Sequence, residues 1–162
     1  MMSEIVAHHL RDKEEITIYD PTSGSGSLLL NIGRSVGKYL AKNKITYYAQ
    51  ELKEATYNLT RMNLVMRGIH PDNILVRNGD TLEEDWPWFD DSDPFASYKP
   101  LYCDAVVSNP PYSQEWSPKE ESSSDPRYSK YGVAPKGTAD YAFLLHDLFH
   151  VKPDGIMTIV LP

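Results

Sequence analysis

The chain has 162 residues and a mass of 18.4 kDa, which is enough for one α/β domain with a real core and too short for two. Its 16 Lys and Arg against 23 Asp and Glu give a formal net charge of −7, so a nucleic-acid partner would need a local basic face or another subunit. With 41% hydrophobic and 24% charged residues, the composition excludes a disordered or fibrous chain.

Membrane and disulfide-rich classes are excluded as well. No apolar run approaches the ~18 to 20 residues that span a bilayer, and Met1 is not followed by a signal-peptide pattern. The single cysteine, Cys103, cannot form a disulfide within the chain and lies in an apolar context. These features predict a cytoplasmic protein.

The alternation of apolar patterns predicts an α/β fold. Helices are expected at 5–10, 27–40, 55–67 and 139–150, and strands at 16–19, 45–49, 73–77, 104–108 and 156–161. A turn at Pro153-Asp154-Gly155 precedes the last strand. In the helix at 55–67 the apolar stripe consists of Ala55, Leu59, Met62 and Met66. Strand, helix, strand, helix, strand within 80 residues favours a parallel sheet with right-handed crossovers. We therefore expect a doubly wound sheet in a single domain over residues 1–162.

Two segments interrupt this alternation. Residues 83–94 hold six acids and no base, with Trp86, Trp88 and Phe89 interleaved, and they are expected to form a surface excursion. Residues 113–138 are rich in Ser, Pro, Lys and Tyr. A loop of that length inside a compact domain is usually functional or mobile, so 113–138 is expected to be an active-site loop.

A glycine-rich run follows the first strand and reads Asp20-Pro21-Thr22-Ser23-Gly24-Ser25-Gly26. In an open α/β sheet, ligands bind at this edge, where backbone amides and a helix N-terminus face a crevice. The dinucleotide pattern G-x-G-x-x-G fails because Leu29 stands where the third glycine belongs, and the phosphate P-loop pattern fails around Gly33 and Gly37. A plain tight turn would explain the glycines alone, but not the carboxylate in front of them.

Carboxylates end three successive strands at this edge. Asp20 ends the first strand, Glu51 the second and Asp80 the third. An ionised carboxylate is suited to the two hydroxyls of a ribose, and another can face an ammonium group. The set suits a nucleoside with a charged tail, such as S-adenosylmethionine. Taken singly, each acid is more typical of a helix cap or a turn.

The tetrapeptide Asn109-Pro110-Pro111-Tyr112 follows the fourth strand. Its prolines fix φ and remove two N–H donors, so the loop presents oxygen acceptors rigidly. An amino group conjugated to a ring is a poor nucleophile, and the Asn109 side chain and Pro110 carbonyl could accept its hydrogens as it attacks an electrophilic methyl group. Tyr112 could stack on the ring, which for a duplex base requires flipping. A structural turn is the alternative, and the shared sheet edge of the two motifs argues against it.

These motifs carry a family resemblance. Residues 20–30, Glu51, 78–81 and 109–112 look like the motifs of class I S-adenosylmethionine-dependent methyltransferases that act on the N6 amino group of adenine. Residues 109–116, 131–136 and 139–146 more narrowly resemble the modification subunit of type I restriction-modification systems. The resemblance implies that the cofactor is bound by Asp20, Thr22, Ser23, Gly24, Ser25, Gly26, Glu51, Asp80 and Thr81, and that the target site consists of Asn109, Pro110, Pro111 and Tyr112.

The same resemblance implies partners and a larger protein. Duplex DNA with a flipped adenine would be the substrate, and a DNA-specificity subunit and a restriction subunit would be partners. Members of the family carry an N-terminal helical domain and a Thr-Pro element before the segment that corresponds to 2–10, and they continue past the fifth strand. We therefore expect a catalytic-core piece, truncated at both ends of the sheet domain. RNA bases or protein glutamine as acceptors, or a noncatalytic nucleoside-binding or docking module, remain alternatives.

A pair of histidines, His146 and His150, has the i, i+4 spacing of a zinc-binding helix. Asp147 stands where the longer Glu is expected, and no third ligand is placed by the sequence. The pattern favours an amphipathic helix with partly exposed histidines, and we predict no metal site.

Overall fold

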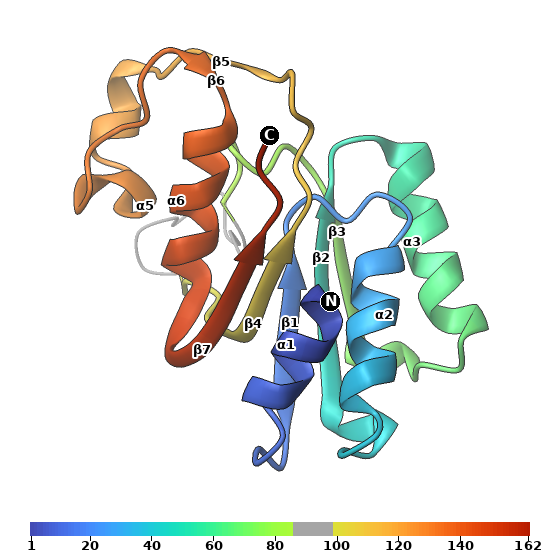
Figure 1. Cartoon of the computed structure of the whole chain (residues 1–162). Coiled ribbons are helices and arrows are strands. Elements are labelled where there is room, and N and C mark those ends of the chain that lie inside the picture. The colour runs from blue at the N-terminus through green and yellow to red at the C-terminus, as the bar shows by residue number, and fades with distance from the viewer. Residues whose placement is uncertain (86–98) are drawn as a thin grey trace.

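The computed structural model describes residues 1–85 and 99–162, and within them five strands form a parallel sheet of order β3-β2-β1-β4-β7 (Figure 1). The strands are β1 (Ile16–Asp20), β2 (Ile45–Glu51), β3 (Ile74–Asn78), β4 (Cys103–Ser108) and β7 (Val151–Ile159). The order reverses direction after β3, so β1 and β4 are neighbours at the centre. Crevices form outside the carboxyl ends of strands at such a switch point.

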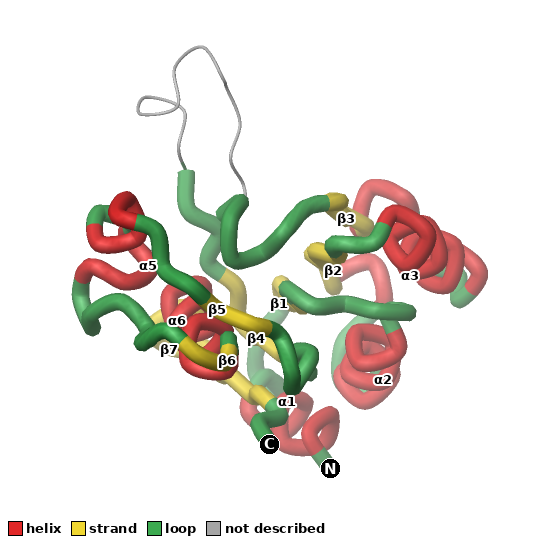
Figure 2. The backbone as a smooth tube through the Cα atoms, turned by 90° about the horizontal axis from the view of Figure 1, so that it is seen from above, coloured by secondary structure: helices red, strands yellow, loops and turns green. Residues whose placement is uncertain are grey.

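Helices cover both faces of the sheet. They are α1 (Met2–His9), α2 (Ser27–Val36), α3 (Glu54–Met66), α5 (Pro126–Ser129) and α6 (Asp140–His150). Adjacent residues of β1 point to opposite faces: Ile18 is buried in the core beneath α1 and α2, whereas the hydroxyl of Tyr19 reaches His146 of α6. Figure 2 shows α2 and α3 on one side of the sheet and α5 and α6 on the other. The doubly wound α/β fold is thus confirmed.

The predicted apolar stripe of α3 is wrong. The exposed fraction is 53% for Met62 and 75% for Met66, while Thr60 and Leu64 are fully buried. The Thr60 hydroxyl donates to the carbonyl oxygen of Gly24 at 2.6 Å, so a polar contact with the glycine-rich loop turns this face of the helix inward. Amphipathic periodicity could not reveal this contact because the two partners are 36 residues apart.

Two element boundaries also differ from expectation. The first long helix ends at Val36 instead of continuing to Leu40, with Gly37 at its C-cap. The expected turn at Pro153-Asp154-Gly155 is a bulge inside β7, where the pairing with β4 shifts between Cys103 and Ala105. A Cβ at Gly155 would lie 2.9 Å from the carbonyl oxygen of Asp104, so the close backbone approach requires glycine there.

The segment 113–138 contains regular secondary structure and is not an irregular loop. β5 (Glu115–Trp116) pairs antiparallel with β6 (Gly137–Thr138), and α5 lies between them in the chain. Trp116 is buried and donates its indole N–H to the carbonyl oxygen of Ala134 at 3.0 Å. Together with Tyr128 and Phe143, Trp116 belongs to a hydrophobic cluster under α6. The segment is therefore fixed to the sheet domain by its own small core.

The structure leaves out most of the acidic segment, and its helices can be compared with the length of a membrane span. The aromatic residues of the acidic segment, Trp86, Trp88 and Phe89, lie outside the described residues. Within the described part of the chain, none of the helices combines the length and apolarity that crossing a bilayer requires.

Candidate active site

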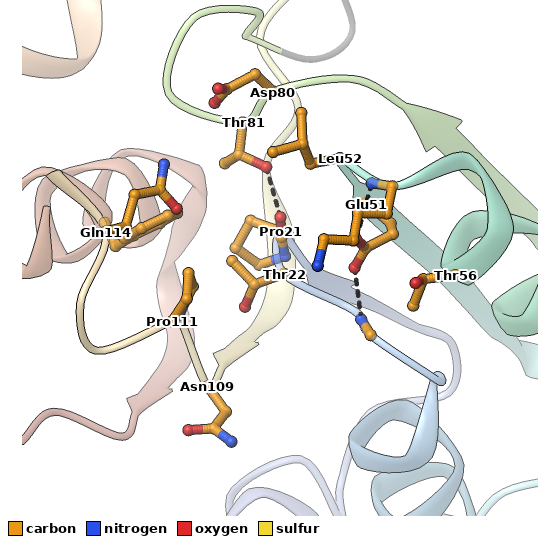
Figure 3. Close-up of a pocket in the computed structure, with 13 residues that line it drawn as sticks. Pro21, Thr22, Glu51, Leu52, Thr56, Asp80, Thr81, Asn109, Pro111 and Gln114 are labelled. Atoms are coloured by element: carbon orange, nitrogen blue, oxygen red, sulfur yellow. Dashed lines mark hydrogen bonds between the residues drawn. The ribbon is translucent and has the colours of Figure 1, made fainter. Parts of the chain in front are cut away.

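A cavity of about 680 Å³ lies where the carboxyl ends of the central strands meet (Figure 3). Both predicted motifs contribute to it. Its lining consists of Pro21, Thr22, Gly24, Glu51, Leu52, Lys53, Thr56, Asp80, Thr81, Asn109, Pro111, Gln114 and Phe143. A volume between about 300 and 1,000 Å³ is typical of sites for small molecules and cofactors.

The glycine-rich loop takes a shape that only glycine adopts easily. Gly24 and Gly26 have φ of 55° and 76°, in the left-handed region. A Cβ at Gly26 would also come within 3.2 Å of the Thr60 side chain of α3. The backbone N–H of Ser23 donates to the carbonyl oxygen of Gln50 at 3.0 Å, which ties the loop to β2. The loop is therefore held from two sides while Thr22 and Gly24 face the cavity.

Glu51 is the most firmly placed of the predicted carboxylates. Its Oε2 accepts the backbone N–H of Gly24 and its Oε1 accepts that of Lys53, both at 3.0 Å. The Asn78 amide donates to the carbonyl oxygens of Glu51 and Leu52, which fixes the end of β2. Each carboxylate oxygen keeps a further lone pair, so Glu51 can accept two hydroxyl hydrogens from a ligand in the cavity.

Asp20 lies behind the cavity and does not line it. Its side chain is 1% exposed, and its Oδ1 accepts the backbone N–H of Thr22 at 3.0 Å. Burial raises the pKa of the Asp20 carboxyl to about 7, against the lowering effect of that N–H, and the nearby Glu51 carboxylate raises it further. Asp20 therefore shapes the loop from beneath, and Thr22 Oγ1 is buried with no hydrogen-bond partner among the described residues.

The turn after β3 is tied to the glycine-rich loop. Asp80 Oδ1 accepts the backbone N–H of Leu82 at 2.9 Å, which closes the turn on itself. The Thr81 hydroxyl donates to the carbonyl oxygen of Pro21, as the dashed line in Figure 3 shows. Both Asp80 and Thr81 line the cavity.

The loop Asn109-Pro110-Pro111-Tyr112, called the acceptor loop below, lies at the other end of the cavity, and Figure 3 shows Asn109 and Asp80 at opposite ends. Asn109 and Pro111 line the cavity, while Pro110 is buried. Tyr112 is 47% exposed and donates its hydroxyl hydrogen to Asn109 Oδ1 at 3.1 Å. The structure thus brings the side-chain acceptor and the stacking candidate together at the entrance.

About half of the residues that line the cavity were predicted from the sequence as site residues. The predicted residues that line it are Thr22, Gly24, Glu51, Asp80, Thr81, Asn109 and Pro111, and those that lie behind or beside it are Asp20, Ser23, Ser25, Gly26, Pro110 and Tyr112. Leu52 and Lys53 were missed although they directly follow Glu51. Gln114 and Phe143 come from segments whose approach depends on the folding of 113–138, so no local pattern marked them.

The prediction of partly exposed histidines is wrong. His146 and His150 are fully buried, and their ring nitrogens lie with an Asp85 oxygen in a group whose atoms are within 4.8 Å of one another. The Arg127 guanidinium can only donate, so His146 Nδ1 accepts from it and the ring proton sits on Nε2. His150 Nε2 lies 2.8 Å from Asp85 Oδ1, so Asp85 supplies the third candidate ligand that the sequence did not place, and the three side chains belong to a buried hydrogen-bonded network.

The fold and the cavity together define a class of protein. A parallel sheet that switches between β1 and β4, with a glycine-rich first loop and an acid at the end of its second strand, is the class I S-adenosylmethionine-dependent methyltransferase fold. The described residues fit this cofactor: Glu51 offers carboxylate oxygens for hydroxyls, Asp80 offers an acceptor, and Gly24 lets the backbone come close to a ligand in the cavity. The chain matches the family model described as N-6 DNA Methylase over residues 1–162, and it belongs to that family.

The chain is also similar to individual methyltransferase subunits of type I restriction enzymes. The chain is 36% identical over 98% of its length to the type I restriction enzyme MpnII methylase subunit of Mycoplasma pneumoniae, and 30% identical over 89% to the HindI methylase subunit of Haemophilus influenzae; it covers 30% of each. It resembles the crystal structure of a type I restriction-modification methyltransferase subunit from Streptococcus thermophilus with a TM-score of 0.86 and 44% identity, over 99% of this chain and 32% of that one. The chain thus spans about a third of the length of these relatives.

Proposed function

We propose that residues 1–162 are the catalytic core of a DNA methyltransferase that transfers a methyl group from S-adenosylmethionine to N6 of adenine, as the modification subunit of a type I restriction-modification system. The observation that carries this proposal is the shared cavity of the glycine-rich loop and the Asn109 loop. The first motif suits a nucleoside cofactor and the second suits an amino group on a flat ring.

At the cofactor end of the cavity, different residues would bind different parts of the cofactor. Glu51 would accept the ribose hydroxyls, and Asp80 and Thr81, which line the same cavity, would hold the cofactor adenine. Thr22 and Gly24 would bind the charged tail, and Asp20, Ser23, Ser25 and Gly26 shape the loop that presents them. When bound, S-adenosylmethionine supplies an electrophilic methyl group.

The target end activates the amino nitrogen. Asn109 Oδ1 and the carbonyl oxygen of Pro110 would accept its two hydrogens, which favours a pyramidal nitrogen with a lone pair free to attack the methyl group. Pro111 keeps the loop rigid, and Tyr112 stacks on the adenine once it has flipped out of the duplex. The amino nitrogen would gain the methyl group and release one proton to water, while the electron pair of the broken S–CH3 bond stays on the cofactor sulfur. No covalent bond between the chain and the base is required in this direct transfer.

Partners complete the proposal. The net charge of −7 offers little attraction for DNA, so a DNA-specificity subunit and the rest of the polypeptide supply the grip, and a restriction subunit completes the system. The names of the relatives as methylase subunits of type I restriction enzymes support this assembly. The segment 113–138 directly follows the Asn109 loop, and its Gln114 lines the cavity. We expect the cytoplasm as the compartment of the reaction.

The test is a transfer assay with the intact protein and its DNA-specificity partner. Duplex DNA, ribosomal RNA and protein are offered in parallel with cofactor labelled at the methyl group. We expect label only in N6-methyladenine of DNA. Label in RNA or in glutamine would replace the substrate class, and calorimetry without any S-adenosylmethionine binding would refute the function altogether.

A further inference from the structure

Arg127 is a buried cation that joins α5 to the turn after β3. It belongs to α5, within the segment that follows the acceptor loop, and its side chain is almost fully buried. Its Nη1 donates to the carbonyl oxygen of Thr81 at 2.7 Å, and its Nη2 donates to that of Leu82 at 3.0 Å. The guanidinium thus donates to two successive backbone carbonyls of the turn after β3.

The remaining donors of Arg127 are also used. Nε contacts both carboxylate oxygens of Asp125, at 3.0 and 3.1 Å, and Nη2 contacts Asp125 Oδ2 at 2.6 Å. A buried cation is tolerated when it is paired and fully hydrogen-bonded, and Asp125 meets that requirement. Lysine could not reproduce the arrangement because an ammonium is a point charge without the planar fork.

The carbonyls that Arg127 holds belong to the turn that shapes the cavity. Thr81 lines the cavity, and its hydroxyl binds the carbonyl oxygen of Pro21 in the glycine-rich loop. A shift of this turn would move Asp80 and Thr81 together and would also loosen the contact to Pro21. The position of the turn is therefore set from a segment about 45 residues further along the chain.

A second set of contacts holds the residues that directly follow this turn. His146 accepts from Arg127 at 3.1 Å and directs its Nε2 proton at the Tyr19 hydroxyl, 3.0 Å away. The Tyr19 hydroxyl donates to Gln50 Oε1, and the Gln50 amide donates to the carbonyl oxygen of Glu84 at 3.0 Å. Burial lowers the pKa of His146, which keeps the ring neutral and able to accept.

We propose that Arg127 is a positioning residue for the cofactor: it holds the turn from Asp80 to Leu82 in its binding shape through the carbonyls of Thr81 and Leu82. Cofactor affinity then depends on the segment that follows the acceptor loop. This inference rests on the proposed function, because it concerns the same cavity.

The test compares Arg127→Lys and Arg127→Met with Ser129→Ala, an exposed residue of the same helix, in the intact protein. Calorimetry with S-adenosylmethionine, at a temperature well below the melting midpoint of each variant, should give at least a 10-fold weaker affinity for both Arg127 variants and no change for the control. The kcat at saturating cofactor should stay within about threefold. Wild-type affinity in Arg127→Lys, or a lower kcat at unchanged affinity, would overturn the proposal.

Two further variants separate positioning from general destabilisation. Thr81→Val removes the hydroxyl bond to Pro21, and a double variant with Arg127→Lys should weaken affinity by less than the product of the single effects, because both act on one turn. Asp125→Asn keeps the guanidinium and serves if the Arg127 variants do not fold; we expect a loss of affinity of about threefold, and unchanged affinity would count against the proposal. Absence of binding in the wild type would refute the proposed function, whereas equal binding in wild type and variants refutes only the role of Arg127.

Discussion

Tyr112 and Asn109 hold each other at the entrance of the site. The amide oxygen of Asn109 has two lone pairs, and the Tyr112 hydroxyl uses one of them at 3.1 Å. The tyrosine therefore orients the amide without removing its capacity to accept a hydrogen from a target amino group. Its exposed ring remains free of the core and available to a base that enters from solvent.

Substitutions at these two residues should separate their contributions. Asn109→Ala should lower the rate of methyl transfer by about 100-fold or more, the loss expected for one acceptor aimed at a developing charge. Tyr112→Phe keeps the ring and loses one hydrogen bond, so a loss of roughly 2- to 10-fold is expected. Single-turnover rates on duplex DNA measure both, with Asn58→Ala on the exposed face of α3 as the control. Full activity of Asn109→Ala would exclude the assigned role.

Asp20 should give the fold a pH dependence of identifiable sign. Its pKa is raised from 3.8 to about 7, so between about pH 4 and pH 7 the folded chain keeps a proton that the unfolded chain has lost. The contribution of Asp20 to the unfolding free energy therefore falls as pH rises through this window, by up to ~1.4 kcal/mol per pH unit. Urea denaturation of wild type and Asp20→Asn should show the variant gaining relative stability from pH 5 to 7.5. Parallel pH profiles would contradict the assignment.

At the scale of elements, α3 shows how a polar contact overrides periodicity. Leu64 is buried and Met62 is exposed, the reverse of the pattern that an apolar stripe predicts. Leu64→Ala should lower the unfolding free energy by roughly 2–5 kcal/mol, as large-to-small changes in a core do, whereas Met62→Ala should change it by less than about 0.5 kcal/mol. Chemical denaturation of the two variants measures this difference. A larger loss for Met62→Ala would restore the sequence-based stripe.

The elements also mark where prediction from sequence succeeds. The strand ends at Asp20, Glu51 and Ser108 were predictable because turn residues and β-branched runs act locally. The burial of His146 and the grip of Arg127 were not, because Tyr19 lies 127 residues before His146 and Thr81 lies 46 residues before Arg127. A buried polar network is defined by such distant partners, and no single segment carries its signal.

At the scale of the whole molecule, cofactor binding should stabilise the fold. A ligand that binds only the folded state at 100 times its Kd adds about 2.7 kcal/mol to the unfolding free energy. S-adenosylmethionine should produce this increase in chemical denaturation, and Glu51→Gln should reduce it at the same concentration. NAD should produce none, because the third glycine of the dinucleotide pattern is replaced by Leu29. Stabilisation by NAD alone would contradict the assigned cofactor class.

At the scale of the sheet, β7 is an edge strand, with β4 as its neighbour. Among the described residues β7 pairs only with β4, so its other side presents the backbone N–H and C=O groups of alternate residues, apart from Pro153, which has no N–H. Such an edge is a template for one more strand. Ser108 and Ile159 are paired at the carboxyl ends of β4 and β7, directly before the Asn109 loop. A parallel strand added to this edge would therefore end on the same side of the sheet as the Asn109 loop.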